Sequence, residues 1–552
     1  MALKQKISKV VVSHINNCYG NNIEYANKIL AAVKYLLHSN IKDYTFPEYI
    51  HLDDLFHEDK EDDILNALAK VNEKESRRKK EGVYYTDSDV TDFLTANTML
   101  NYILSDNDKI YGVIKAKNKL KRIKNIDKIK LIHASIFDPT CGTGEFLLSA
   151  LYLKITLLKN INSVKYEDLA KTVYGNDIEL QSTDITKLRL FFLLVDSYNG
   201  ELAVDNVASY INANFTNVDA VVYDRKTFGK KDIIIGNPPY VEYRNFDNTP
   251  QFNYGNIYAD VLHHSVDILT DNGVMAFVIP LSYVSTIRMS KIRNYISNNT
   301  DRQIVLNFAD RPDSLFSCVH QKLTIIIAQK ESTFKGVLSS SYNYWYQSER
   351  NNLFDNIKVS LTDSDNFEYW PKIGNLIEKS LYNKFKTMTG FQLLSLNNKG
   401  ETADLYINQR GCFWMKAFTH DMHSNSYTKY SVAKELMPFI FCLINSSLFF
   451  LLWVIISDGW HITNKELNFV KIPSNIGDSQ KWVKLMNQLE TKLEQTKLYV
   501  GTKQVEYEYK HKECKTIIDE IDDELSKVFN VKLSQLHYIK NFALKYRLGN
   551  GA

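Results

Sequence analysis

The chain has 552 residues, which is too long for one ordinary domain and predicts two or three. Its net charge of +3 neither requires nor excludes a nucleic-acid partner, and its six scattered cysteines include no Cys-x-x-Cys pair. That spacing disfavours a zinc site or a disulfide framework, so we expect no metal centre and a reduced, cytoplasmic environment. The first residues contain no apolar core of a signal peptide.

The N-terminal part of the sequence is polar, with helical periodicity. We predict a helical region over residues 1–81, ending in the charged run 73–81, which is typical of a solvated helix end. An apolar helix is predicted at 90–104, and a lysine-rich segment follows at 115–124. Clustered lysines can contact phosphates, but they are also typical of a wet surface.

From residue 131 to about 330, short apolar strands alternate with helices. This alternation predicts a parallel sheet with helices on both faces, and ligands of such sheets bind beyond the carboxyl ends of the strands. The predicted strands are 135–137, 172–174, 233–235, 274–279, 304–308 and 323–328, and the predicted helices are 145–158, 180–195 and 258–269.

Beyond residue 335 the alternation is lost. Residues 335–475 are aromatic-rich, with strands predicted at 402–407 and 412–418, and Trp414, Trp460 and His461 are candidates for base contacts, although core packing is the commoner role. The uncharged run 437–456 has the length of a membrane span, but its Pro and Asn residues favour a buried core segment, so no membrane is expected. Residues 478–545 are predicted to be helical, with Leu485, Leu489 and Leu493 on one face.

The segment 137–146 carries the first chemical motif, in which a strand ends in Asp138, a Gly-x-Gly turn follows at Gly142 and Gly144, and a helix begins. Glycines let a backbone approach a ligand closely. The acid would repel a pyrophosphate but attract an ammonium group, and Leu147 stands where a dinucleotide fingerprint has its last glycine. Both features favour S-adenosylmethionine over a dinucleotide.

Two further acids follow the next strands. Asp177, with Glu179 as the alternative, stands where nucleoside-binding sheets place the acid that takes the ribose hydroxyls. Asp219 could accept the amino group of the cofactor's adenine. Either residue could also be an ordinary surface acid.

The tetrapeptide Asn237-Pro238-Pro239-Tyr240 follows the apolar run 233–235. Two prolines make the loop rigid and remove backbone donors. The Asn237 side-chain oxygen and the Pro238 carbonyl could each accept an N–H from an amino group on a planar ring, and Tyr240 could stack on that ring. A nucleobase with an exocyclic amino group fits this loop, although a plain proline-rich turn has the same sequence.

With these motifs in this order, the sequence resembles the gamma-class N6-adenine DNA methyltransferases, the restriction-modification enzymes with an Asn-Pro-Pro-Tyr motif. The resemblance covers about 82–330 and, more loosely, extends to 475. Residues 82–86 resemble the family's Tyr-Tyr-Thr-Pro motif, with Asp87 in place of the proline, and residues 256–260 and 273–280 resemble the segments after the catalytic loop. Residues 443–450 resemble a core helix of target-recognition domains.

The resemblance implies roles for individual residues. Phe316, with Phe308 as the alternative, would pack on the face of the flipped base opposite Tyr240. Catalysis is assigned to Asn237, Pro238, Pro239 and Tyr240, and cofactor binding to Tyr85, Thr86, Asp138, Thr140, Cys141, Gly142, Gly144, Asp177 and Asp219.

The implied fold is α/β, a Rossmann-like sheet of the S-adenosylmethionine-dependent methyltransferases with a helical N-terminal region and a mixed α+β target-recognition domain. The implied regions are an N-terminal helical region (1–81), a catalytic domain (82–334), a target-recognition domain (335–477) and a C-terminal helical region (478–552). The implied activity is methyl transfer from S-adenosylmethionine to N6 of a flipped-out adenine at a specific site in double-stranded DNA. A restriction-modification or phage-defence context, with separate restriction or defence-complex subunits, is expected.

Other functions use similar sequences. RNA and protein-amide methyltransferases share the Asn-Pro-Pro-Tyr motif, and a DNA-recognition subunit could retain the fold without activity. A fused nuclease is disfavoured, because the one notable Glu-x-Lys near the start, at residues 58–60, lies in a polar stretch with helical character.

Overall fold

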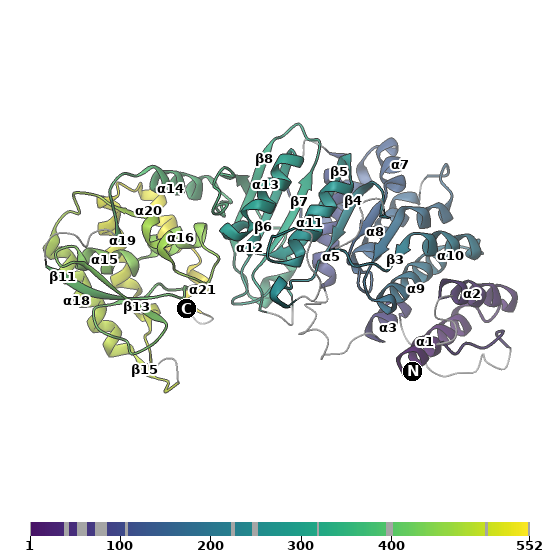
Figure 1. The fold of residues 1–552 in the computed structure, drawn as a ribbon, viewed down its shortest axis with the longest axis horizontal. Helices are drawn as coiled ribbons and strands as arrows, with labels where there is room; N and C mark the ends of the chain where they lie inside the picture. The colour runs from purple at the N-terminus through teal and green to yellow at the C-terminus, as the bar shows by residue number, and fades with distance from the viewer. Residues whose placement is uncertain are drawn as a thin grey trace.

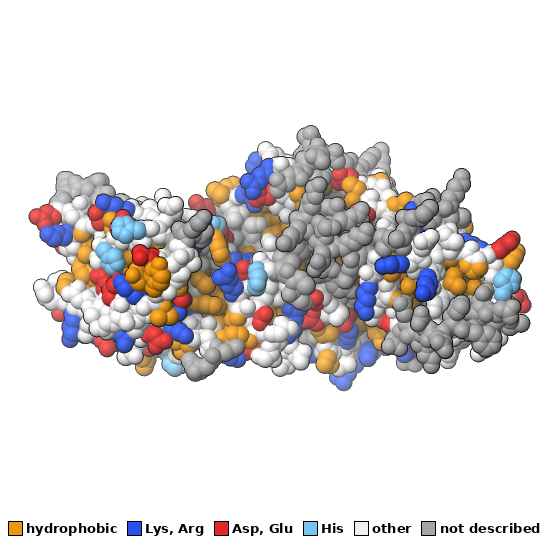
Figure 2. Space-filling model, turned by 90° about the horizontal axis from the view of Figure 1, so that it is seen from below, with side chains coloured by type: hydrophobic (Ala, Val, Ile, Leu, Met, Phe, Trp, Pro, Cys, Tyr) orange, Lys and Arg blue, Asp and Glu red, His pale blue; other side chains and the backbone are white. Residues whose placement is uncertain are grey.

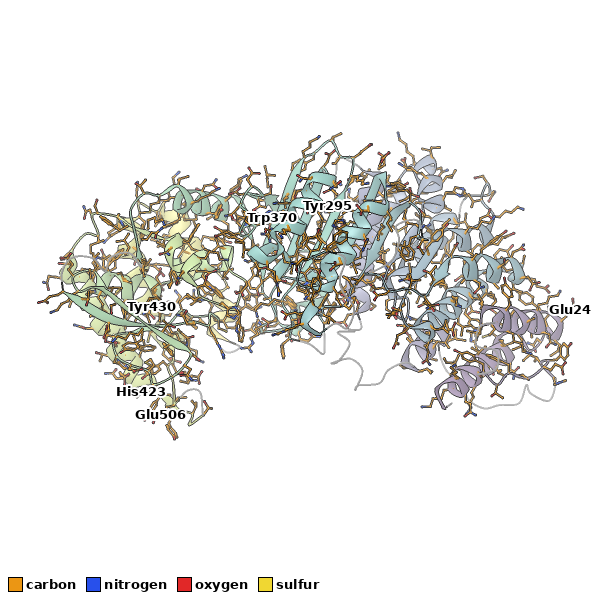
Figure 3. All side chains as sticks on the ribbon, viewed as in Figure 1. Glu24, Tyr295, Trp370, His423, Tyr430 and Glu506 are labelled. Carbon is orange, nitrogen blue, oxygen red and sulfur yellow. The ribbon has the colours of Figure 1, made fainter. Side chains whose placement is uncertain are left out.

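The computed structural model describes residues 2–37, 44–51, 63–71, 86–104, 109–159, 161–221, 227–245, 252–316, 320–393, 401–502 and 506–549. The molecule is elongated, with a large sheet and its helices in one half and a smaller, mostly helical half beside it (Figure 1). The N terminus lies at the outer end of the sheet-containing half, and the C terminus lies near the junction of the two halves. Figure 3 places Tyr295 and Trp370 in the sheet-containing half, and Tyr430, His423 and Glu506 at the far end of the other half.

The N-terminal helices pack against the helices of the sheet. α2 (Ile23–Leu36) contacts α9 (Leu180–Ser197) and α10 (Val204–Ala213), and α3 (Ile64–Val71) contacts α9. α1 (Ala2–Tyr19) packs on α2 and α3. The buried Lys187 ammonium donates to the Leu36 carbonyl at 2.9 Å and so caps the C-terminal end of α2. The predicted helical N-terminal region is confirmed, whereas its charged run 73–81 lies outside the described residues.

The central sheet has nine strands in the order β3-β2-β1-β4-β5-β7-β6-β8-β9. β3, β2, β1, β4 and β5 are mutually parallel, and β7 runs antiparallel to both β5 and β6. The strands are β1 (Ile136–Asp138), β2 (Val173–Asn176), β3 (Phe215–Thr216), β4 (Lys231–Gly236), β5 (Leu269–Pro280), β6 (Arg302–Phe308), β7 (Leu323–Gln329), β8 (Gly336–Asn343) and β9 (Val359–Leu361).

The predicted strands and helices of this half are confirmed to within a few residues, but the predicted parallel sheet is a mixed one, because one of its predicted strands runs antiparallel. The described residues of the connection from 309 to 322 contain no helix, so the chain turns back and β7 enters antiparallel. β8 and β9 also continue the sheet past residue 334. The division of the chain into domains stays a prediction.

Both faces of the sheet are buried, which explains the unbroken apolar runs. Ile233 and Ile235 face one core, and Ile234 faces the other. α5 (Ser88–Ile103), α8 (Glu145–Leu158) and α9 cover the first face, and α11 (Ile257–Ile268) covers the second. The remaining helices of this half are α6 (Val113–Arg122), α7 (Asn125–His133), α12 (Ser282–Ser285) and α13 (Ser290–Asn299).

The C-terminal half combines a small antiparallel sheet with helices. β11 (Thr402–Asn408) lies between β12 (Ala417–Phe418) and β13 (Tyr427–Ala433), so the strand predicted at 412–418 forms only at its last two residues. The other elements are α14 (Leu376–Thr387), β10 (Phe391–Gln392), α15 (Met437–Ile444), α16 (Ser447–Ile456), α17 (Asn464–Phe469), β14 (Lys471–Ile472), α18 (Ser479–Thr496), β15 (Leu498–Tyr499), β16 (Tyr507–Glu508), α19 (Lys515–Val528), α20 (Leu533–Asn541) and α21 (Leu544–Leu548).

The uncharged run 437–456 forms α15 and α16, which meet at an angle of 62°. Ser446 causes the break, because its hydroxyl accepts from the Phe449 amide at 3.0 Å and caps α16. Every residue of α16 is buried, as predicted for a core segment. Among the described residues no single helix has the length and hydropathy to cross a membrane, and these two meet that criterion only as a bent pair.

Candidate active site

The predicted site residues come together at the carboxyl edge of the sheet. β1 lies between β2 and β4, so Asp138, Asp177 and Asn237 follow three adjacent parallel strands. Gly236 stands directly against the first acid, because a Cβ added there would lie 2.6 Å from Asp138 Oδ1. The acid at the tip of β1 and the start of the Asn-Pro-Pro-Tyr loop are therefore in contact.

The turn after β1 is held by both acids. Asp138 Oδ1 accepts from the Thr140 amide at 3.0 Å, and Asp177 Oδ2 accepts from the Gly142 amide at 2.9 Å. Gly142 and Gly144 have φ values of +51° and +92°. A Cβ at Gly144 would lie 2.7 Å from Thr186, whereas one at Gly142 would meet nothing within 4 Å. The glycine turn is thus packed on one side and open at Gly142, where a ligand could approach its backbone.

Asn176, which the sequence reasoning missed, ties three strand ends together. Its amide nitrogen donates to the carbonyls of Pro139 at 3.0 Å and Val218 at 2.9 Å. Its oxygen accepts from the Thr216 hydroxyl at 2.9 Å and the Val218 amide at 3.0 Å. This fully buried side chain sets the relative positions of the loops after β1 and β3. An asparagine at the end of a buried strand, just before the acid, was the available signal.

The acids at this edge are partly withdrawn from water. Burial raises the pKa of Asp177 to about 6, although the amides of Glu179 and Gly142 oppose that rise. Burial also raises the pKa of Asp138 well above its usual range. Asp219 is half-buried, and its Oδ1 accepts from the Val221 amide at 2.9 Å. Burial likewise raises the pKa of the Cys141 thiol, which argues against a nucleophilic thiolate there.

The Asn-Pro-Pro-Tyr loop is joined to the segment that resembles the Tyr-Tyr-Thr-Pro motif. Asn237 Nδ2 donates to Thr86 Oγ1 at 3.1 Å, across 151 residues of sequence. The Tyr240 hydroxyl contacts Asn237 Oδ1 and also lies 3.0 Å from the Val278 carbonyl. Pro238 is buried, whereas Asn237, Pro239 and Tyr240 are half-buried. Tyr85 and residues 82–84 lie outside the described residues.

Asp87, which stands in place of the family's proline, is part of an ion-pair network. Arg350 donates to Asp87 Oδ2 at 3.3 Å and to Asp89 Oδ1 at 2.9 Å. The same guanidinium donates to the Leu315 carbonyl at 2.9 Å, directly before Phe316. Arg350 therefore connects the Thr86 segment with the loop after β6, and no motif in the sequence pointed to it.

The predicted base-stacking aromatics are buried. Phe316 is 2% exposed, and Phe308 is 0% exposed and packs edge-on against Trp345 with ring centroids 5.9 Å apart. Neither ring offers a free face in this structure. A stacking role for Phe316 stays a prediction that requires its loop to open.

A hollow of about 800 Å³ lies elsewhere, in the C-terminal half. Two of the residues that line it, His423 and Glu506, lie at the end away from the large sheet (Figure 3). Its acid Glu490 accepts from the Thr419 amide and hydroxyl, at 2.9 and 2.7 Å. Within the described ranges, no three His, Cys, Asp or Glu side chains are grouped so that they could hold a metal ion.

Residues 171–316 match the model of a family described as Eco57I restriction-modification methylase. The resemblance to restriction-modification methyltransferases is confirmed. This methylase segment, residues 171–316, contains Asp177, Asp219 and the Asn-Pro-Pro-Tyr loop, and ends at Phe316.

Two curated relatives align around the methylase segment. The type II restriction enzyme and methyltransferase RM.Eco57I of Escherichia coli is 20% identical over 306 residues, which cover 46% of this chain and 31% of that protein. The type II methyltransferase M.CvrRI of Paramecium bursaria Chlorella virus XZ-6E is 30% identical over 156 residues, which cover 28% of this chain and 31% of that protein. The chain spans about a third or less of the length of the curated relatives it matches.

A solved structure shares the fold over nearly the whole chain. The structure of the type IIL restriction-modification enzyme MmeI in complex with DNA has a TM-score of 0.51 and 14% identity, covering 95% of this chain and 90% of that one. The predicted α/β methyltransferase fold, with its additional C-terminal half, is therefore confirmed.

Proposed function

We propose that this chain transfers a methyl group from S-adenosylmethionine to N6 of an adenine flipped out of double-stranded DNA, within a restriction-modification or phage-defence system. The bond from Asn237 Nδ2 to Thr86 Oγ1 carries the proposal. This bond uses the Asn237 amide nitrogen as a donor within the protein and fixes the orientation of the amide. The side-chain oxygen is then the group that can accept from a substrate amine. Asp138 is in contact with Gly236, directly before Asn237, and the open turn at Gly142 lies at the same edge of the sheet.

The residues at the edge fit S-adenosylmethionine. Thr140 Oγ1 is buried and has no hydrogen-bond partner within the described part of the chain, so a polar ligand group would satisfy it. Asp177 would accept ribose hydroxyls, Asp138 would face the ammonium group, and Asp219 would accept the adenine amine. When bound, S-adenosylmethionine supplies a methyl group that its sulfonium charge has already activated.

The Asn-Pro-Pro-Tyr loop would prepare the amine for attack. Adenine N6 is a poor nucleophile because its lone pair is delocalised into the ring. Acceptance of its two N–H bonds by Asn237 Oδ1 and the Pro238 carbonyl favours the tetrahedral form and stabilises the positive charge that develops on nitrogen. Asn237 is not basic, so the surplus proton leaves to water after the transfer.

The Tyr240 hydroxyl must first release Asn237 Oδ1. A phenol has one proton, so it can donate to Asn237 or to the Val278 carbonyl, but not fully to both. Rotation toward Val278 leaves the amide oxygen to the incoming amine, and the ring can then stack on the base. Stacking on an aromatic side chain is worth about 1–3 kcal/mol per base, which offsets part of the few kcal/mol that flipping requires.

Methyl transfer from labelled S-adenosylmethionine should be measured side by side on duplex DNA, RNA and protein. We expect transfer to duplex DNA alone, on adenine N6, and a loss of at least about 10²-fold in Asn237→Ala with cofactor affinity retained. Labelling of RNA or protein instead would overturn the proposed substrate. Cofactor binding without any transfer would identify a silent recognition subunit.

Tyr240 offers a matched pair of variants. Tyr240→Ala should lower methyl transfer more than it lowers duplex binding, because it removes the stacking ring. Tyr240→Phe keeps the ring and frees Asn237 Oδ1, so it should retain most of the activity. Equal losses of transfer and duplex binding in Tyr240→Ala would exclude the stacking role.

A further inference from the structure

The connection between β6 and β7 lies at the same edge as the candidate active site. β6 runs parallel to β5 and β4, so its end at Phe308 and the start of β7 at Leu323 both meet the edge that carries Asn237. Arg311 follows the end of β6, and Lys322 immediately precedes β7. Because β7 is two strands from β4, the two strands lie about 10 Å apart across the sheet, which is less than the width of a DNA major groove of about 12 Å.

Three cationic side chains from different segments surround one ring at this place. The Lys322 ammonium lies 4.7 Å from the Trp460 ring centroid, the Arg311 guanidinium 5.7 Å and the Arg410 guanidinium 6.0 Å. Arg410 precedes the turn whose Gly411 amide donates to the Trp460 carbonyl at 2.7 Å. The Trp460 amide donates to Asp458 at 2.8 Å, so the half-buried ring is held in position.

Two of the three charges are available to a ligand. Lys322 pairs with Asp310 at 3.1 Å. Arg311 and Arg410 are exposed, and no carboxylate of the described residues lies within 4 Å of either guanidinium. The Trp460 ring attracts each cation from its face, but the like charges still repel one another. An anion with several charged groups would relieve that repulsion and use the free guanidinium donors.

We propose that Arg311, Lys322 and Arg410, arranged around Trp460, bind the phosphodiester backbone of double-stranded DNA beside the flipped base. This basic cluster deepens the proposed function and rests on it. It contains residues of both halves of the molecule, so one stretch of backbone would touch the connection after β6 and the turns around Arg410 and Trp460 in the C-terminal half. Figure 2 shows Lys and Arg side chains intermixed with acidic ones over both halves, so local clusters rather than net charge would direct such contacts.

Salt dependence tests the proposal without knowledge of the recognition sequence, because phosphate contacts dominate non-specific binding. The affinity of the full chain for a duplex oligonucleotide should be measured between 50 and 200 mM salt (about the range over which such slopes are resolved). Each of Arg311→Gln and Arg410→Gln should reduce the slope of log K against log salt by about 1, and the double variant by about 2.

Lys335→Gln is the matched control. Lys335 lies between β7 and β8 at the opposite edge of the same sheet, is exposed and pairs with Asp301 at 3.3 Å. Its loss removes one charge and should leave the slope unchanged. Unchanged S-adenosylmethionine affinity in every variant would show that the site remains folded.

The outcomes separate this inference from the proposed function. Suppose that the parent chain methylates duplex DNA. If the arginine variants then show the parent's slope of log K against log salt, the cluster does not bind the backbone. The same conclusion follows if Lys335→Gln lowers that slope as much as the arginine variants do. If inorganic phosphate competes with the duplex at equal phosphate concentration, the cluster is a small-anion site and the proposal is wrong. Absence of methyl transfer to duplex DNA in the parent chain would instead contradict the proposed function.

Discussion

The carboxyl edge of the large sheet and the C-terminal half of the chain are organised by different kinds of contact. At the edge, short bonds join neighbouring strand ends, as from the Gly142 amide to Asp177 and from Asn176 to Pro139. In the C-terminal half, buried groups join residues that are distant in sequence. Arg547, for example, stacks on Trp414 at 4.0 Å and donates to Ser447 Oγ at 3.2 Å. Sequence motifs therefore brought most of the acids and the Asn-Pro-Pro-Tyr loop to this edge, but they gave no signal for the buried polar contacts of the C-terminal half.

The two regions should therefore respond differently to substitution. Changes at the edge are expected to alter ligand binding and transfer, even where they also lower stability, because its side chains position loops that remain partly open. Changes at the buried polar groups of the C-terminal half are expected to lower stability, because these groups connect helices.

Asn176→Ala should have the largest effect, because it leaves the Thr216 hydroxyl and the Val218 amide without their acceptor. Losing several buried bonds is expected to cost about 3 kcal/mol of stability and to weaken S-adenosylmethionine binding. Denaturant unfolding and calorimetric binding would measure both. Asn217→Ala is the control, since Asn217 is exposed and its side chain only donates, to the Asp177 carbonyl at 3.0 Å and the Thr183 hydroxyl at 2.8 Å. Equal effects of the two variants would refute the role assigned to Asn176.

Asp522→Ala should mainly destabilise the C-terminal half. Its buried carboxylate accepts from the Ser447 and Leu448 amides, at 3.3 and 3.1 Å, at the N-terminal end of α16. Loss of this cap is expected to cost about 2 kcal/mol in chemical denaturation. Asp523→Ala on the same helix removes a partly exposed acid that pairs with Lys540, and it should cost less. A loss of cofactor affinity in Asp522→Ala at temperatures where it is folded would contradict the separation of the two regions.

Arg350→Gln should lower methyl transfer about thirtyfold, with a smaller change in melting temperature, because Arg350 links the Thr86 segment to the loop of Phe316. Arg350→Lys keeps the charge but cannot reproduce the paired bonds to Asp89, so it should recover only part of the rate. A parallel fall of stability and rate in both variants would leave Arg350 with a purely structural role.

Because of the raised pKa of Asp177, we expect cofactor binding to weaken modestly as the pH falls. Its carboxyl, with a pKa raised by burial to about 6, must ionise to accept ribose hydroxyls, so affinity should fall about tenfold from pH 7 to pH 5. Stability changes in the opposite direction. Between about pH 4 and pH 6 the Asp177 carboxyl is protonated in the folded state but ionised in the unfolded state. Burial of the ionised carboxyl therefore lowers the free energy of unfolding above about pH 6, and this loss disappears below about pH 4. Asp177→Asn should remove the step near pH 6 in a calorimetric titration, and persistence of that step would assign it to another group.

Sequence reasoning placed the strands around the site to within a few residues, because buried apolar runs and glycine turns are local signals. It also brought Asp138, Asp177 and Asn237 to one edge, since parallel strands end together. It missed the antiparallel entry of β7, which depends on the connection from 309 to 322. It could not find Arg350, because Asp89 lies 261 residues away in the sequence.

The amino-acid sequence alone determined the type of sheet-based fold, the edge at which the site forms and the residue types available for chemistry, because these follow from periodicity and short motifs. Only the tertiary structure decided which groups distant in sequence meet near the site. Asn237 bonds to Thr86, Arg350 bonds to Asp87, and three cationic side chains lie around the Trp460 ring. The reason is physical. Local backbone preferences act over a few residues, whereas these contacts arise only when packing brings separate segments within hydrogen-bond or cation–π distance.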